Sequence, residues 1–244
     1  MKNLSSDILF HFTSCYDVLE KILKSGFLLS NSVENFSDMN ANSQSTHFIH
    51  PMVCFCDIRI SQIDLHTEHY GKFAIGMSKK CGINKKLNTV SYFNKNSIYF
   101  DNLRNLFNDQ TKGNQFVKFT PEEIMILKYL KEYEGYFHKI RGNKIFYDER
   151  EWRFVLDQNH GTQHQKLILP FKNEDDHDKL EEIRKKINDN NKKEYLEIDL
   201  NEIECIIVEK NSDLNNLVTF LKNESLEITV HSPIISFDKI NKFI

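Results

Sequence analysis

The chain has 244 residues and a mass of 28.9 kDa, and its 32 Lys and Arg residues against 35 Asp and Glu residues give a formal net charge of -3. This balance argues against a protein that coats nucleic acid along its whole surface, and a hydrophobic content of 40% argues against a disordered chain. No apolar run approaches the ~20 residues of a membrane span, and the N-terminus lacks the basic region of a signal peptide. We therefore expect a soluble, cytoplasmic protein without a membrane partner.

The hydrophobic pattern predicts more strands than helices, without the regular alternation of a doubly wound sheet. The expected strands are, in chain order, 8–13, 52–58, 73–78, 89–93, 145–156, 166–171, 202–208 and 227–235. The expected helices are 14–23, 120–140, 175–190 and 212–221, and 31–46 is expected to be a polar loop. This order of elements favours an α+β fold.

Cap residues mark the ends of these helices. Ser14 is expected to cap the first helix, and Gly26 to end it in a left-handed conformation. The run Thr-Pro-Glu-Glu at 120–123 combines a capping box with Pro at the first helical position, which is a strong helix start. Ser212 is expected to cap the helix that follows the strand at 202–208.

The segment Tyr-Asp-Glu-Arg-Glu-Trp-Arg at 147–153 is the most informative one. On a strand, alternate side chains share a face, which would bring Glu149, Glu151 and Arg153 together. Two carboxylates and a guanidinium on one face indicate a strand that lines a cleft. The alternative is an edge strand whose ion pairs contribute little stability.

The first strand carries a second candidate, the run Phe-His-Phe-Thr at 10–13. His11 and Thr13 share one face of this strand. A lone histidine of this kind has two interpretations: it either contributes to a site or fills a structural position with its hydrogen bonds satisfied.

Two cysteines and two histidines raise the question of a zinc site. Cys54-x-Cys56 and His66-x-x-His69 lie close in the sequence, but the spacing differs from the usual two-residue knuckle. We therefore expect no metal, and we expect these thiols to be small buried apolar groups. The chain's cysteines are odd in number and irregularly spaced, which indicates reduced thiols.

Four lysines surround a turn between two expected strands. They are Lys79, Lys80, Lys85 and Lys86. Such a cluster is usually a solvated hairpin tip, and the alternative is a local phosphate-binding patch on an otherwise neutral protein.

Taken together and in order, these segments resemble known families. The strand at 8–13, followed by a helix and Gly-Phe-Leu at 26–28, is similar to the opening of DarT-type ADP-ribosyltransferases. From about residue 8 to residue 235 the chain is more closely similar to the AbiGi family of abortive-phage-resistance proteins. The segments that carry this second resemblance are His-Phe-Thr at 11–13, Val-Cys-Phe-Cys-Asp-Ile at 53–58, His-Tyr-Gly at 69–71 leading into 75–79, and 147–153.

The resemblance implies an ADP-ribosyltransferase-like fold, which is a split, mostly antiparallel sheet with flanking helices. It also implies one domain over residues 1–244 and NAD as the substrate in the cleft of the sheet. In that superfamily a first-strand residue orients NAD, a role that His11 with Thr13 would take here. A late-strand glutamate is catalytic, and Glu149-Arg150-Glu151 has the Glu-x-Glu form in which the second carboxylate acts.

The remaining roles follow from the same resemblance. Tyr70 or Phe55 would form the aromatic platform for nicotinamide, because Cys54-Phe55-Cys56 lacks the Ser-Thr-Ser form of one branch. Arg153 would either bind a pyrophosphate oxygen or hold Glu151 in place.

Two functions follow as expectations. The first is an anti-phage, NAD-dependent ADP-ribosyltransferase that modifies a nucleic acid or a protein, with the lysines at 79, 80, 85 and 86 contacting a nucleic-acid acceptor. The second is a non-catalytic, antitoxin-type protein that binds a partner toxin encoded by a neighbouring gene.

Overall fold

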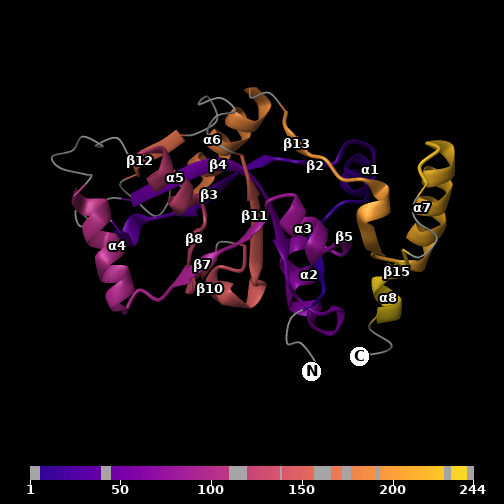
Figure 1. The fold of residues 1–244 in the computed structure, drawn as a ribbon, viewed down its shortest axis with the longest axis horizontal. Coiled ribbons are helices and arrows are strands. Elements are labelled where there is room, and N and C mark those ends of the chain that lie inside the picture. Colours follow the sequence, from indigo (N-terminus) through magenta and orange to yellow (C-terminus); the bar gives the residue numbers. More distant parts are fainter. Residues whose placement is uncertain are drawn as a thin grey trace.

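The computed structural model has a mostly antiparallel central sheet with helices on both faces (Figure 1). The structure describes residues 6–39, 45–109, 120–137, 139–156, 166–171, 177–190, 193–227 and 232–240. Parts of the expected polar loop at 40–44, of the 120–140 helix at 138, of the 175–190 helix at 175–176 and of the last strand at 228–231 lie outside these residues.

The central sheet takes strands from both halves of the chain. Its strands are β1 (Ile8–Thr13), β3 (Ser30–Asn35), β4 (Ser45–Cys56), β5 (Phe73–Ser78), β6 (Asn88–Thr89), β11 (Glu151–Val155), β12 (Lys166–Phe171), β14 (Ile203–Val208) and β15 (Ile234–Ser236). Their order is β15-β14-β5-β1-β4-β11-β6, and β3 and β12 also pair with β4. The α+β fold class is therefore confirmed.

Three short strand pairs flank this sheet. They are β2 (Phe27–Leu28) with β13 (Tyr195–Leu196), β7 (Ser91–Phe93) with β8 (Leu130–Glu132), and β9 (Glu134–Phe137) with β10 (Gly142–Ile145). Among the described strand pairs, β7–β8 and β14–β15 are parallel and the rest antiparallel.

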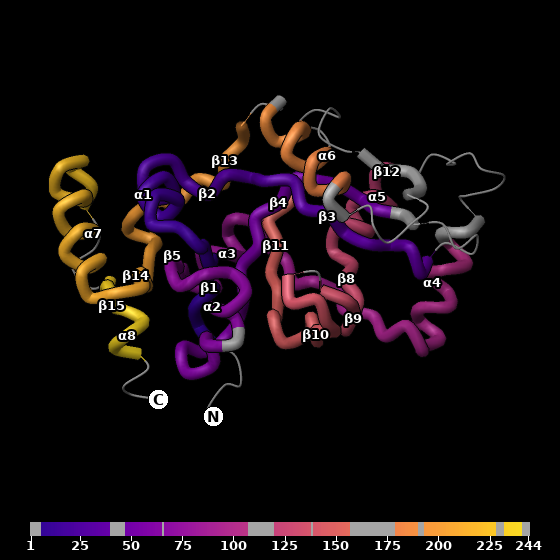
Figure 2. Tube along the Cα trace, turned by 180° about the vertical axis from the view of Figure 1, so that it is seen from behind, coloured from indigo at the N-terminus to yellow at the C-terminus, as the bar shows by residue number. Residues whose placement is uncertain are grey.

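The helices cover the sheet from both sides (Figures 1 and 2). They are α1 (Tyr16–Ser25), α2 (Asp64–Tyr70), α3 (Lys79–Asn84), α4 (Ile98–Asp109), α5 (Pro121–Lys128), α6 (His177–Asn190), α7 (Asn211–Asn223) and α8 (Phe237–Ile240). Helices α1, α3 and α7 pack on one face of the sheet, and α8 packs on the other. Within the described residues, every helix is too short or too polar to cross a membrane.

The first helix shows how the sequence specifies this packing. Leu19, Ile22 and Leu23 recur at helical spacing and are all buried against the sheet. Gly26 ends the helix with a φ of 82°, a conformation that side chains disfavour. Burying the apolar stripe of α1 therefore fixes the helix over β1 and β5.

The sheet forks along β4, and this fork positions the candidate site. Toward its start, β4 pairs with β3 through Ser30↔Met52, and at its end it pairs with β1 through Phe10↔Cys56. Cys54 lies between these two pairings, where β1 and β3 diverge from β4. A backbone carbonyl in such a gap needs a partner from elsewhere.

Several expected elements are confirmed. The strands at 8–13, 73–78 and 166–171 have the expected bounds. The helix start at 120–123 is also confirmed, since Thr120 accepts a hydrogen bond from the Glu123 backbone and the Glu123 carboxylate accepts one from the Thr120 backbone.

Other expected elements are wrong. Residues 31–39 of the expected loop hold β3 and a short 3-10 helix, Ser37–Met39. The helix that starts at Pro121 ends at Lys128 and gives way to β8 and β9. The basic turn after β5 is helix α3.

Smaller corrections concern strands and caps. The strand expected at 89–93 divides into β6 and β7, which pair with different partners. The N-caps of α1 and α7 are Cys15 and Lys210, in place of Ser14 and Ser212.

Candidate active site

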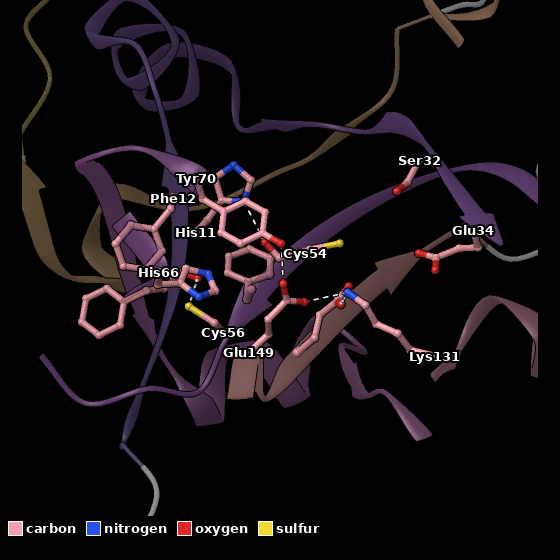
Figure 3. Close-up of a pocket in the computed structure, with 13 residues that line it drawn as sticks. His11, Phe12, Ser32, Glu34, Cys54, Cys56, His66, Tyr70, Lys131 and Glu149 are labelled. Carbon is pink, nitrogen blue, oxygen red and sulfur yellow. Dashed lines mark hydrogen bonds and ion pairs between the residues drawn. The ribbon is translucent and has the colours of Figure 1, made fainter. Parts of the chain in front are cut away.

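A cavity of about 210 Å³ lies at the fork of the sheet (Figure 3). Its lining comes from β1, β3, β4, α2, β8, the 3-10 helix Phe146–Glu149 and β11. The lining residues are Phe10, His11, Phe12, Ser32, Glu34, Cys54, Phe55, Cys56, His66, Tyr70, Lys131, Glu149 and Glu151. Residues far apart in the chain thus meet where β1 and β3 separate.

His11 fills the gap in backbone pairing at the fork. Its Nδ1–H donates a hydrogen bond of 2.8 Å to the carbonyl oxygen of Cys54 (Figure 3), and its ring packs 5.1 Å from Phe27 and 5.6 Å from Phe55. Burial lowers the pKa of His11 below its usual value. The ring is therefore neutral at pH 7, and its Nε2 is an acceptor.

Thr13, the other candidate on β1, lies outside the cavity lining. It is buried and pairs in register with Phe73 of β5. Its carbonyl oxygen lies so close to Gly71 that a Cβ there would be 2.4 Å away, and the φ of Gly71 is 102°. The geometry therefore brings His11, and not Thr13, to the cavity.

Glu149 and Glu151 meet by a different route from the one expected. Glu149 ends a 3-10 helix, Phe146–Glu149, and Arg150 adopts a left-handed conformation with a φ of 43° before Glu151 begins β11. The expectation of one continuous strand over 145–156 is wrong. The left-handed residue turns the chain, and both carboxylates still enter the cavity and are about 95% buried.

Lys131 joins the two carboxylates. Its Nζ lies 2.6 Å from an oxygen of Glu149 and 2.6 Å from an oxygen of Glu151. Lys144 binds the other oxygen of Glu149 at 2.7 Å, and the Tyr70 hydroxyl donates to that same oxygen. Burial acts to raise the pKa of Glu149, but Lys131 and Lys144 outweigh it and hold the pKa at about 2. Both glutamates are therefore ionised at neutral pH.

Arg153 lies beneath Glu151 and is fully buried. Its Nε donates to Glu151 at 2.7 Å, its Nη1 to the carbonyl oxygen of Lys128 at 2.6 Å, and its Nη2 to Glu34 at 2.7 Å. Burial acts to raise the pKa of Glu151, and Arg153 with Lys131 holds it below its usual range. Of the two roles left open for Arg153, this geometry favours holding Glu151 in place.

Three ring side chains, Phe12, His66 and Tyr70, form another part of the cavity wall. His66 packs 5.0 Å from Phe12 and 4.6 Å from Tyr70, ring centre to ring centre. Burial lowers the pKa of His66 to about 4, so this ring is also neutral at pH 7. Tyr70, one of the two candidate platform residues, thus belongs to α2 and not to a strand. The other candidate, Phe55, lines the cavity from β4.

Sequence reasoning missed several members of this cluster. Glu34, Tyr92, Lys131 and Lys144 come from separate elements with no local pattern to mark them, and the sequence pattern marks His66 only as a possible zinc ligand. Tyr92 supports the site from outside, because its hydroxyl accepts the backbone N–H of Glu151 at 2.9 Å. A signal was available only in part, since Lys131 stands amid acidic neighbours at 132 and 134.

Three of the four residues considered for zinc line the cavity. They are Cys54, Cys56 and His66, whereas His69 lies outside the lining. The cysteines are all free thiols, and burial raises the pKa of Cys54 and Cys56 well above the usual value. Among the described residues, no cluster of three or more His, Cys, Asp or Glu side chains is arranged to hold a metal ion.

The four lysines of the basic turn lie around α3, outside the cavity lining. Lys79 pairs with Asp57 at 2.6 Å, and Lys85 pairs with Glu202 at 2.8 Å. Lys80 and Lys86 are exposed. The positive charge of this patch is thus half neutralised by ion pairs.

Comparisons with known proteins identify a family for the chain. The sequence model described as "Putative abortive phage resistance protein AbiGi, antitoxin" matches residues 26–209. The abortive phage resistance protein AbiGi of Lactococcus lactis subsp. cremoris is 31% identical over 146 residues, which are 52% of this chain and 59% of that relative. The match thus spans less than two thirds of the relative's length. No solved structure matches the chain. The family match covers most of the chain and includes all of the cavity lining except β1, and the chain belongs to the AbiGi family of abortive phage resistance proteins.

Proposed function

We propose that this chain is an NAD-dependent ADP-ribosyltransferase that acts in abortive infection. The position of Glu151 carries the proposal: its carboxylate enters a cavity at the fork of the sheet, and His11 of the first strand lines the same cavity. A late-strand glutamate and a first-strand histidine at one cleft is the arrangement that the resemblance to DarT-type enzymes implies.

The cavity residues fit one end of NAD. A volume of about 210 Å³ is below the ~300–1,000 Å³ of typical ligand pockets, so the cavity suits the nicotinamide riboside end and not the whole dinucleotide. The rings of Phe12, His66 and Tyr70 offer planar apolar surface to the nicotinamide ring. The carboxylates of Glu149 and Glu151 offer acceptors for ribose hydroxyls.

The proposed reaction replaces nicotinamide by an acceptor group. The bond between nicotinamide and C1′ of the ribose breaks, its electron pair leaves with nicotinamide, and positive charge develops on the ribose. Glu151 accepts a hydrogen bond from the 2′-hydroxyl and stabilises that charge. The nucleophilic atom of the acceptor then bonds to C1′, and its proton passes to solvent.

Arg153 and Lys131 act on this step through Glu151. Arg153 is fully buried and positions the carboxylate through a bond of 2.7 Å. Lys131 occupies the other oxygen of Glu151 at 2.6 Å, and a bound ribose hydroxyl would share or replace this contact. For a nucleic-acid acceptor, Lys80 and Lys86 are the members of the basic patch with exposed side chains.

The test measures NAD consumption. Wild-type protein is incubated with labelled NAD, candidate nucleic-acid and protein acceptors, and phage lysate, beside Glu151→Gln. We expect wild type to release nicotinamide and label an acceptor, and Glu151→Gln to lose both activities. Glu132→Gln is the matched control, because Glu132 is a largely buried, ion-paired glutamate outside the cavity lining.

Glu151→Gln removes one carboxylate partner from Lys131 and one from Arg153, so its folding needs a separate check. The double variant Glu151→Gln/Lys131→Gln restores the charge balance. If the folded double variant transfers ADP-ribose at the wild-type rate, or if wild type neither binds nor consumes NAD under any condition, the transferase proposal is wrong.

A second candidate function is a non-catalytic antitoxin that binds a partner toxin. The family description names an antitoxin, and the charged cluster supports this reading independently. The oxygens of Glu149 and Glu151 already bind Lys131, Lys144, Tyr70 and Arg153, as expected of a purely structural network. This function predicts that Glu151→Gln, once folded, still protects cells from phage, and that the protein co-purifies with the product of an adjacent gene.

A further inference from the structure

Two lysine ammonium groups converge on the ring of Tyr70, at the wall of the cavity. Nζ of Lys144 lies 4.7 Å from the ring centroid and Nζ of Lys139 lies 5.0 Å from it. Lys144 is neutralised by Glu149 at 2.7 Å. Lys139 donates to the carbonyl oxygen of His69 at 3.1 Å, and no carboxylate among the described residues lies within ion-pair distance of it.

The surroundings of Lys139 are electrically positive. Its pKa is lowered first by the partial burial of its side chain, then by Lys144 and by Arg184 of α6, and the carboxylates of Glu181 and Glu149 act less strongly in the other direction. An ammonium group held near two other cations is stabilised by an anion placed between them. An anionic ligand beside Lys139 would therefore neutralise a positive charge that no described carboxylate pairs with.

The position of these groups sets the kind of anion. Lys139 belongs to the turn between β9 and β10, and Lys144 to β10, so both reach the Tyr70 ring from the same hairpin. Tyr70 lines the cavity whereas the two lysines lie outside its lining, so an anion bound by the two ammonium groups would lie beside a residue of the cavity wall. Lysine ammonium groups are point charges suited to phosphate oxygens.

We propose that Lys139 and Lys144 form a phosphate-binding site beside Tyr70, for a phosphate covalently attached to the group that enters the cavity. The phosphate belongs either to a dinucleotide or to the backbone of a nucleic acid. This site rests on the proposed function, because the phosphate belongs to a ligand of the same cavity, but its test measures binding and not transfer.

The test is calorimetric titration of the full chain with inorganic pyrophosphate. We expect wild type to bind, and Lys139→Ala to bind at least about tenfold more weakly, as expected for the loss of one charge-assisted hydrogen bond. Lys139→Arg keeps the charge and should retain binding. Lys222→Ala is the matched control, because Lys222 is an exposed lysine on α7, outside the cavity lining. Lys139 is itself exposed, so its truncation leaves the core intact.

Wild type that fails to bind pyrophosphate overturns the proposal, and so does an equal affinity of Lys139→Ala and Lys222→Ala. Competition then separates the two sources. Displacement of pyrophosphate by NAD assigns the site to a dinucleotide, and displacement by a single-stranded oligonucleotide but not by NAD assigns it to a nucleic acid. If neither displaces it, the site holds an adventitious anion only and the proposal is wrong. Because no transfer is measured, failure of the transferase leaves this result unaffected.

Discussion

Replacing Lys131 by Met tests whether the buried charges of the cavity stabilise the fold. Lys131 Nζ binds Glu149 and Glu151 at 2.6 Å each, and the three side chains are 14%, 5% and 6% exposed. The pKa of Glu149 falls from 4.5 to about 2 on folding, which corresponds to about 3 kcal/mol of stability at pH 7. Because Lys144 supplies part of this, and because Glu151 also loses a partner, we expect Lys131→Met to cost about 3–5 kcal/mol at pH 7.

The pH dependence gives a second, sharper signature. In wild type the pKa of Glu149 is lower when folded, so its contribution is present above pH 4.5 and is lost as the pH falls toward 2. In Lys131→Met, burial and the mutual repulsion of the glutamates raise their pKa values, so a carboxyl group takes up a proton as the pH falls from 7 to 4. The stability difference between variant and wild type should therefore shrink over that range.

Chemical denaturation followed by fluorescence measures both effects, with Trp152, the only tryptophan, as the probe. Lys95→Met is the matched control. Lys95 also bridges two carboxylates, Asp38 and Glu132, but it is 38% exposed and Asp38 is 59% exposed, so its loss should cost about 0–1 kcal/mol. Equal losses in the two variants at pH 7, or an unchanged difference at pH 4, would refute the reasoning.

Three further predictions concern stability. Gly71→Ala should destabilise the chain by more than about 1 kcal/mol in thermal denaturation, because φ is 102° and a Cβ would lie 2.4 Å from a carbonyl oxygen. Gly142→Ala should be nearly neutral, because a Cβ there would lie 3.8 Å from the nearest atom. Burial lowers the pKa of His66 to about 4, so its neutral ring stabilises the fold above pH 6.5, and this stabilisation is lost as the pH falls toward 4. His66→Phe should therefore flatten the dependence of unfolding free energy on pH between these values, and an unchanged dependence would contradict the lowered pKa. Tyr92→Phe leaves the backbone N–H of Glu151 without its 2.9 Å acceptor, which should cost about 1–3 kcal/mol and speed hydrogen exchange at that amide.

The sequence predicted those parts of the fold that carry their own local signal. β1 and β5 are rich in apolar residues, and both form strands of the central sheet. β3 has the polar sequence Ser-Asn-Ser-Val-Glu-Asn, which carries no local strand signal. It is a strand because it pairs with β4 and because Asn31 donates a hydrogen bond to Asn188 of α6, and both contacts form only on folding. The helix expected to reach residue 140 ends at Lys128 because the next residues pair with β7 instead, a tertiary contact that overrides helix propensity.

The candidate site likewise contains residues that the local sequence predicts and residues that it does not. The sequence predicts Glu151 and Arg153 together because two residues on one strand share a face, and in the structure they form an ion pair at 2.7 Å. Strand alternation also predicts Glu149 beside them, but a left-handed Arg150, and not a continuous strand, brings Glu149 into the cavity. Lys131 could not be found, because a lysine in sequence indicates exposure, and only the two carboxylates that neutralise it make its burial favourable.

The charge balance of the cluster decides how a ligand can enter it. Among the described residues of the ion-pair cluster, Glu34, Glu149 and Glu151 face Lys131, Lys144 and Arg153, so the cluster is close to neutral and a ligand gains little from charge alone. A ligand hydroxyl that bonds to Glu151 must share an oxygen with an existing partner or replace that partner.

Arg153 is fully buried and binds three groups at once, whereas Lys131 is 14% exposed and lines the cavity, which makes Lys131 the exchangeable partner. If the cluster is a substrate site, removing Lys131 frees one oxygen of Glu151, and folded Lys131→Met should bind nicotinamide riboside more tightly than wild type. If the cluster is only structural, the same substitution lowers stability and leaves ligand binding undetectable in both proteins. Lys131, and not the glutamates, is therefore the residue whose variant separates a catalytic cleft from a structural ion network.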